Sequence, residues 1–292
     1  MFKYIFKSSY KSFYGKIGYI FLILLISLSF LHNFLLTSDI WPQNIYHPIV
    51  GFDIEIFPHP TPPSSNHLLG TDPLGRDVMS MFMAGSRPLI LLSLFSFFIG
   101  LFVSLFIGTL MPFIYKRTDS LIKEVSSGVI LMPPPLVLLI LGTGEFVDKL
   151  SPSMVGIIYG VLSGLGVSYL VIRAKVLEIE NAEYIKAARI TGGSKFYIAT
   201  RHVQPIVAPY AVSLMLTSTT YGIIAYGYAS FFGQVGWTPN WGMMIYDAIT
   251  YGSFLGGINY WNLIPPTIGF LLCSSSFYLL SVSVNKQFGI SI

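Results

Sequence analysis

Six long apolar stretches constrain what this chain can fold into more than any other feature of its sequence. An α-helix needs about 20 mostly apolar residues to cross the hydrocarbon core of a membrane, and each stretch is long enough to do so. Only 10% of the 292 residues are charged, against about 25% in soluble domains, so lipid is the expected solvent. The predicted spans cover residues 17–36, 88–115, 120–142, 153–172, 207–231 and 262–284. The sequence therefore predicts an all-α membrane protein with six transmembrane helices.

The placement of lysine and arginine predicts the orientation of these spans. If the N-terminus is cytoplasmic, 14 of the 17 Lys and Arg residues fall in segments on the cytoplasmic side. The three that remain outside are Arg76, Arg87 and Lys149. This asymmetry follows the positive-inside rule and predicts that both termini are cytoplasmic. It also accounts for the formal net charge of +4 through the membrane lipid, without a nucleic-acid partner.

The spans divide the chain into four parts. A cytoplasmic tail and the first span occupy 1–36, and an external loop follows at 37–87. A five-helix core covers 88–285, with a charged cytoplasmic segment at 178–205, and a cytoplasmic tail lies at 286–292. The first span follows a Lys-bearing tail, as a signal peptide would, but its apolar run is long and no small-residue cleavage site closes it. We expect it to remain as an anchor.

Common motifs of ATP hydrolysis and of hydrolytic enzymes are missing from the sequence. It has no Gly-x4-Gly-Lys-Ser/Thr loop, no His-Glu-x-x-His and no Gly-x-Ser-x-Gly. The single cysteine, Cys273, excludes a disulfide framework and a Cys-based zinc site. A nickel site at His47, His59 and His67 is conceivable, but these loop histidines lack tight ligand spacing. We predict no catalytic residue, metal site or cofactor in this chain, so the energy must arrive from a partner.

The cytoplasmic segment at 178–204 has the pattern of two short helices joined by a glycine turn. Asn181 is the predicted N-cap of the first helix, and Glu183 lies near its positive end. Gly192 and Gly193 allow this helix to stop with positive φ.

A second short helix is predicted over 194–201, leading to Pro205 at the start of the next span. Helix physics alone leaves two interpretations of this segment open. It can be an amphipathic connector that rests on lipid headgroups. Alternatively, it can be a docking surface, because Ala187 and Ala188 let another protein approach closely.

The same segment resembles the EAA loop of ABC importer permeases. The residues that carry the resemblance are Glu183, Tyr184, Ala187, Ala188, Arg189, Gly192, Ser194, Arg201, His202, Val203 and Pro205. Lys186 replaces the Glu of the family's Glu-Ala-Ala triplet, and His202 and Gln204 replace its Ile and Leu. The Tyr-x-x-Ala-Ala-Arg and Arg-His-x-x-Pro runs are nevertheless similar to the peptide-transporter branch. The resemblance implies a coupling helix that docks on an ATPase subunit.

Two further stretches resemble the dipeptide, oligopeptide and nickel permease family. The Gly-Thr-Asp-x-x-Gly-Arg-Asp signature of its C-type subunit is matched, near the external end of the second span, by Gly70, Thr71, Asp72, Gly75, Arg76 and Asp77. Read by itself, this pattern also fits a capped turn held by local hydrogen bonds. The family's external Gly-rich loop, which ends in Trp-Gly, resembles the residues from Phe231 to Gly233 and from Trp237 to Gly242.

Together these resemblances imply a type I ABC importer permease fold, with six transmembrane helices and a cytoplasmic coupling helix. The implied partners are a homologous second permease, two ATP-binding subunits that hold ATP and magnesium, and an extracytoplasmic solute-binding protein. The implied cargo is peptide, with oligosaccharide and nickel as related alternatives.

Two other functions remain to be weighed against this one. An ion-coupled secondary transporter would work without an ATPase, but it needs buried ionisable residues or repeated discontinuous helices. The spans contain few charges. We expect Glu145 and Asp148 to be solvated at the external end of the third span, and Asp247 to lie in the last external loop. A membrane enzyme or a scaffold is the third possibility.

Proline and glycine mark two of the spans. The prolines at 133–135 interrupt the third span, where a broken helix could line a pathway, although a plain kink is more common. Glycines recur every four residues in the fourth span, at Gly156, Gly160 and Gly164. Such a face lets helices pack closely, and we expect it to pack the span against its own bundle.

Overall fold

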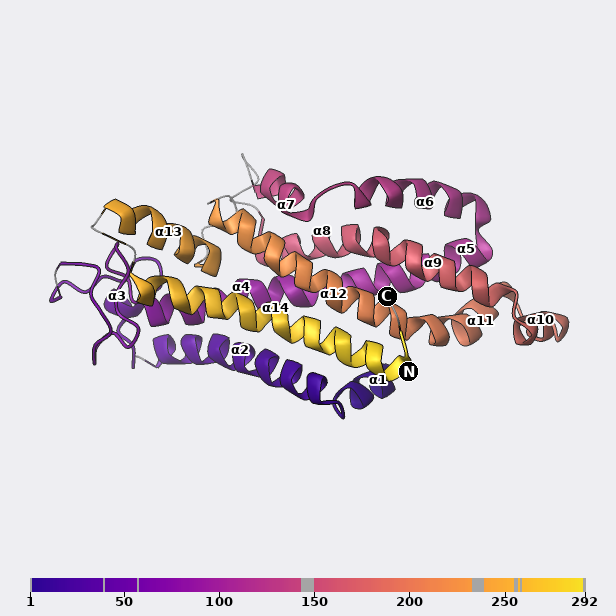
Figure 1. Cartoon of the computed structure of the whole chain (residues 1–292), viewed down its shortest axis with the longest axis horizontal. Helices are drawn as coiled ribbons and strands as arrows, with labels where there is room; N and C mark the ends of the chain where they lie inside the picture. Colours follow the sequence, from indigo (N-terminus) through magenta and orange to yellow (C-terminus); the bar gives the residue numbers. More distant parts are fainter. Residues whose placement is uncertain are drawn as a thin grey trace.

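Long helices that run roughly along one axis make up most of the computed structural model, which describes residues 2–38, 40–56, 58–142, 150–232, 239–254, 257 and 259–290 (Figure 1). Five continuous helical stretches are long and apolar enough to cross a membrane. They are α2 (Phe13–Thr37), α4 to α5 (Val78–Ile114), α8 to α9 (Pro152–Glu180), α11 to α12 (Lys195–Phe231) and α14 (Tyr260–Phe288). They coincide with five of the six predicted spans.

The remaining predicted span, the third in chain order, is broken rather than kinked. It consists of α6 (Lys116–Ile130) and α7 (Pro134–Gly142), and its segments Lys116–Ile130 and Pro134–Ile140 meet at 87°. The prolines cause the break, because a proline lacks an amide donor and suits the first turn of a helix but not its interior. The more common alternative, a plain kink, is therefore wrong here.

The second span begins at Val78, ten residues before the predicted start at residue 88. Asp77 is the N-cap of α4 (Val78–Phe102), and its side chain accepts a hydrogen bond of 2.7 Å from the amide of Ser80. Such a cap satisfies an amide that the helix leaves unpaired. Pro88 consequently lies within the helix instead of starting it.

The fifth span begins earlier as well. The predicted separate helix over 194–201 is not separate: α11 (Lys195–Ile198), a π-helical turn (Ala199–Val203) and α12 (Gln204–Phe231) form one continuous stretch. Pro205 is tolerated there because it lies in the first turn of α12, directly after the π-helical turn has interrupted the regular ladder.

Close backbone contact joins α8 (Pro152–Leu165) to α4. A Cβ placed on Gly156 would lie 2.6 Å from the carbonyl oxygen of Leu92, and one placed on Gly160 would lie 2.9 Å from that of Ser96. Gly164 meets the carbonyl oxygen of Gly100 in the same way, at 2.9 Å. The glycine face therefore packs this span against its own bundle, as the sequence predicts.

Polar side chains join α12 to α14 inside the bundle. The hydroxyl of Ser281 lies 3.0 Å from that of Ser213 and 2.8 Å from that of Thr217. The far side of α14 packs on α2, whose outer face exposes Ile20, Phe30 and other apolar side chains that suit lipid. The N-terminal helix α1 (Phe2–Ser9) also packs on α14.

The two ends of the bundle carry different short elements (Figure 1). The helix α10 (Glu183–Ile190), α11 and both chain termini lie toward one end. The opposite end holds the loops around α3 (Gln43–Tyr46) and the helix α13 (Trp241–Phe254). For clarity we call these the α10 end and the α13 end.

Candidate functional site

The turn between α10 and α11 is built by local capping. Ala182 is the N-cap of α10, so the prediction of Asn181 is wrong. Asn181 instead closes α9 (Val167–Glu180), where its side-chain amide donates to the carbonyl of Leu177. Gly192 follows α10 with φ of +86°, a conformation that favours glycine. The hydroxyl of Ser194 then caps α11 by accepting from the amide of Tyr197, at 3.2 Å.

One face of the α10–α11 turn is buried and the other is open. Ile185 and Ile198 are fully buried and attach the two helices to the bundle. On the open face Ile190 is 86% exposed, and Phe196 and Tyr197 are also exposed. Sequence reasoning missed these three apolar residues, although their position beside the glycine pair in a polar segment could have marked them.

Most of the predicted coupling residues are exposed. The exposed ones are Glu183, Tyr184, Ala187, Arg189, Gly192, Ser194, Arg201 and Pro205. Ala188 is only partly exposed and packs toward the bundle. Arg189 also contacts its own chain, because its guanidinium donates to Glu180 at 3.0 Å and lies 5.3 Å from the centre of the Phe113 ring.

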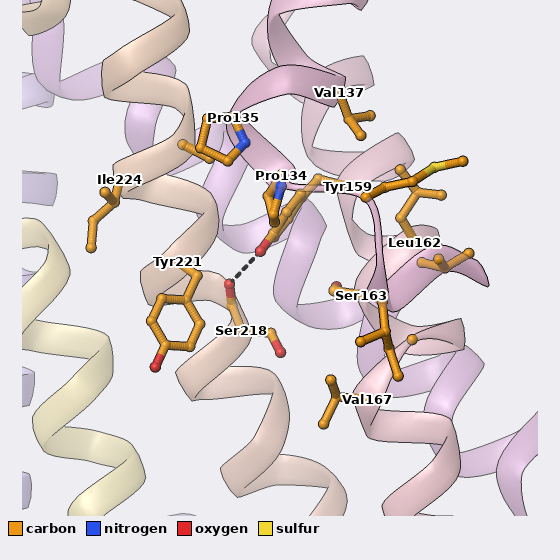
Figure 2. A pocket seen from close by; sticks show the side chains of 15 residues that line it. Pro134, Pro135, Val137, Tyr159, Leu162, Ser163, Val167, Ser218, Tyr221 and Ile224 are labelled. Carbon is orange, nitrogen blue, oxygen red and sulfur yellow. Dashed lines mark hydrogen bonds between the residues drawn. The ribbon is translucent and has the colours of Figure 1, made fainter. Parts of the chain in front are cut away.

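A cavity of about 350 Å³ lies at the broken span. Its walls come from the break and α7, from α8 with the start of α9, and from α12 (Figure 2). The hydroxyl of Tyr159 donates to the carbonyl of Ser218 at 3.0 Å, across the cavity's floor. Tyr221 and Ile224 border it from α12, and both are more than 40% exposed. The lining is almost entirely apolar, with hydroxyl groups as its polar atoms.

At the α13 end, the predicted Gly-Thr-Asp-x-x-Gly-Arg-Asp motif forms a buried ionic cluster. Asp72 accepts hydrogen bonds from the amides of Leu74 and Arg76, so the local turn is present. The guanidinium of Arg76 then donates to Asp72 at 2.5 Å and to Asp247 on α13, also at 2.5 Å. The motif therefore attaches α13 to the start of α4, across 171 residues of sequence. Burial raises the pKa of Asp247, although Arg76 opposes that shift.

A second buried group lies beside this cluster. His67 is fully buried, with Nδ1 at 2.8 Å from Asp77 and Nε2 at 3.2 Å from Asp53. Burial raises the pKa of Asp77, while His67 and the amide of Ser80 lower it. The other two loop histidines have different partners: His59 lies 2.9 Å from the hydroxyl of Thr71, and His47 accepts from the amide of Ile49.

The third predicted motif is described only in part. Gly233, Trp237 and Thr238 lie outside the described residues, as do Glu145 and Asp148. Trp241 is fully buried, stacks on Phe82 and donates from Nε1 to the carbonyl of Phe82 at 2.8 Å. This tryptophan therefore anchors the first turn of α13 against α4.

Comparison with known proteins identifies the family. A family model described as the inner membrane component of binding-protein-dependent transport systems matches residues 100–289. The dipeptide transport system permease protein DppC of Bacillus subtilis is 26% identical over 227 residues, covering 75% of this chain and 67% of the relative. The oligopeptide permease protein OppC of Lactococcus lactis is 26% identical over 214 residues (72% and 71%). The glutathione permease protein GsiD of Pectobacterium atrosepticum is 26% identical over 236 residues (78% and 72%). This chain therefore belongs to the family of inner membrane components of binding-protein-dependent transport systems, which are ABC importer permeases of the type I fold.

Proposed function

We propose that this chain imports peptides, and that the open face of the α10–α11 turn docks on an ATP-binding subunit. The observation that carries the proposal is the exposure of Tyr184, Ile190, Phe196 and Tyr197, which all lie in the short segment 184–197 at the α10 end. Clusters of exposed apolar side chains mark interaction sites. The names of the relatives, which are dipeptide, oligopeptide and glutathione permeases, support peptide as the cargo.

The complete transporter in this proposal contains four membrane-associated subunits and a solute-binding protein. A homologous second permease pairs with this chain, and two ATP-binding subunits hold ATP and magnesium. The exposed face of α6 supports a protein or aqueous neighbour, because Lys123, Glu124 and Ser127 are exposed beside Leu121 and Val125. A face with this mixture is costly against lipid.

The docking surface of the proposal consists of the exposed predicted coupling residues other than Arg189, together with Ile190, Phe196 and Tyr197. Ala187 and Gly192 are the closest-approach points, because they lack bulky side chains and a Cβ at Gly192 would meet nothing within 4 Å. Ala188 supports this surface from beneath. The residues that line the cavity beside Tyr221 form part of the wall of the cargo path.

Orientation follows from the same assignment. ATP-binding subunits are cytoplasmic, so the α10 end faces the cytoplasm, and both termini lie toward that end (Figure 1). The α13 end then meets the solute-binding protein outside. The concentration of lysine and arginine at the α10 end supports this direction.

Reconstitution into proteoliposomes with the co-expressed partner subunits and binding protein tests the proposal. We expect uptake of a labelled dipeptide or tripeptide that requires ATP, with no uptake of a labelled oligosaccharide or of nickel. Ala187→Glu adds a bulky charge to the docking surface and should release the ATP-binding subunit or abolish uptake. Ala187→Ser keeps the side chain small and is the matched control. Peptide uptake that is driven by an ion gradient without ATP would overturn the proposal in favour of a secondary transporter.

A further inference from the structure

Glu180, the last residue of α9, lies where three helices meet. Its Oε1 accepts a hydrogen bond of 3.0 Å from Arg189 of α10 and lies 3.5 Å from the ammonium group of Lys116, the first residue of α6. The Glu180 side chain is only 15% exposed. One carboxylate oxygen thus holds the end of the coupling helix and the start of the broken span to α9.

A second and more buried joint lies one turn further along α6. The carboxylate of Asp119 is 7% exposed and accepts from Nε and from a terminal nitrogen of Arg173, at 2.8 and 2.7 Å. The hydroxyl of Tyr169 donates to the same carboxylate at 2.6 Å. Both partners belong to α9. A forked guanidinium contact of this kind fixes direction as well as distance.

Apart from these joints, α6 makes little buried contact with the rest of the chain. Of its residues, all of which the structure describes, only Asp119 and Ser126 are buried. By contrast, α8 lies against α4 at backbone contact. The ionic groups at the first turn of α6 therefore supply its most buried polar contacts to α9, and one of them, Glu180, also binds Arg189 of α10.

We propose that Glu180, Arg189, Asp119 and Arg173 are positioning residues that make α6 follow the coupling helix, so that movement of α10 changes the geometry of the break at 131–133 and of the cavity beside it. In this assignment Arg189 acts inside the chain, through Glu180 and the Phe113 ring, rather than as a contact to the ATP-binding subunit. The inference rests on the proposed function and adds the route by which ATP-driven movement reaches the cargo path.

Two glutamates on α9 provide a matched test. Glu180→Gln removes the charge that links α6, α9 and α10. Glu178→Gln removes a charge two residues away, where Glu178 is 68% exposed and pairs with Lys175 of its own helix, at 2.8 Å. In the reconstituted complex, Glu180→Gln should raise the ATP hydrolysed per peptide imported by about 3- to 10-fold, the size expected when a few side chains carry the coupling. Glu178→Gln should leave this ratio unchanged.

Arg173 supplies a second series. Arg173→Gln should raise the same ratio, and Arg173→Lys should recover part of the coupling, because lysine keeps the charge beside Asp119 but lacks the fork. A merely structural role would lower uptake and ATP hydrolysis together and would leave their ratio unchanged.

Spin labels can follow α6 directly. Gly128→Cys provides one site on α6, where an added side chain meets nothing within 4 Å, and Met154→Cys provides a reference on α8, where Met154 is 51% exposed. Cys273 is buried and should not be labelled. In an otherwise wild-type complex, ATP trapping should shift the distance between the labels. Glu180→Gln and Arg173→Gln should reduce this shift by at least about 2-fold.

Three results would overturn the inference. The first is a coupling ratio in Glu180→Gln equal to that in Glu178→Gln. The second is release of the ATP-binding subunit by Arg189→Gln, which would make Arg189 a docking contact. The third is the absence of ATP-dependent uptake in the wild type, which would remove the proposed function and this inference with it. The first two leave the proposed function intact, so the failures are distinguishable.

Discussion

The α13 end and the open face of the α10–α11 turn use charged residues in opposite ways. At the α13 end Asp53, His67, Asp72, Arg76, Asp77 and Asp247 are all buried. At the α10 end the ion pair between Lys186 and Glu183 is open to solvent, with side chains 54% and 90% exposed. Apolar side chains do not follow this division, because Ile190 and Phe196 are exposed at the α10 end and Val50, Ile54 and Leu68 are exposed at the α13 end.

The contrast indicates that the charged cluster of the α13 end is satisfied within the chain. Buried charges are tolerated only when they are paired and hydrogen-bonded, and the α13 end meets that requirement within the chain. Exposed apolar side chains are instead covered when another protein binds. Substitutions at the α13 end should therefore affect folding, whereas substitutions at the open face of the α10 end should affect assembly and leave folding intact.

The largest effect is expected at Arg76. Arg76→Ala would leave the carboxylates of Asp72 and Asp247 buried without their common partner. Breaking a buried pair by removing one member costs about 3–5 kcal/mol, so we expect a lower apparent melting temperature in detergent and less folded protein. Arg87→Ala, at an exposed position of α4, is the control. If the two variants were equally stable, the distinction between the ends would fail.

A pair of isoleucines in α10 gives an intermediate effect that separates assembly from folding. Ile190→Asp changes a side chain that is 86% exposed, so stability should change by no more than about 0.5 kcal/mol. Retention of the ATP-binding subunit should nevertheless fall by about 10-fold, since the charge lies on the docking surface. Ile185→Asp changes a fully buried side chain of the same helix and should lower the apparent melting temperature as well as the retention. Pull-down of the complex and thermal unfolding distinguish these outcomes.

The smallest effect concerns the protonation of Asp77. Because burial raises its pKa above the unfolded value of about 3.9, the folded chain takes up this proton at higher pH than the unfolded chain does. The contribution of Asp77 to stability is thus present below pH 3.9 or so and is lost as the pH rises through the folded pKa. Lowering the pH from 7 toward the folded pKa should therefore favour the wild type over Asp77→Asn.

Infrared difference spectra of the same two proteins would locate the proton directly. The band of the protonated carboxyl group should appear in the wild type at a pH above the ordinary pKa of aspartate. It should be missing from Asp77→Asn. A band that appears only near the ordinary pKa of aspartate would show that burial does not dominate the pKa of Asp77.

The spans were predictable from sequence because a membrane-crossing helix needs a long apolar run, and such runs need no knowledge of tertiary contacts. Their ends were less predictable, because capping decides them. The polar motif around Asp77 reads as a loop. However, Asp77 caps α4, so the helix begins at Val78 rather than at the predicted residue 88. Similarly, Pro205 reads as a helix start, although the π-helical turn before it lets the helix run through.

The site was predictable only as far as local sequence reaches. The glycine turn at Gly192 followed from spacing, and most of the residues that the resemblance assigns to coupling are exposed, although their role stays a prediction. The partnership of Arg76 with Asp247 depends on tertiary folding across 171 residues, so no local pattern could reveal it. The same is true of Arg189, whose intramolecular contacts with Glu180 and Phe113 cannot be read from the motif that contains it.

The glycine contacts between α8 and α4 have a mechanical consequence. The backbones of α8 and α4 touch at Gly156, Gly160 and Gly164. Sliding one helix past the other by a turn would drive larger side chains into carbonyl groups, so the two helices move as one rigid unit. Any bending during a transport cycle is left to the places where the helices are interrupted. Within the described residues, those places include Gly166 between α8 and α9, the proline break after α6 and the π-helical turn before α12. The stiffness of one helix pair thus restricts the hinges of the whole subunit to a few residues.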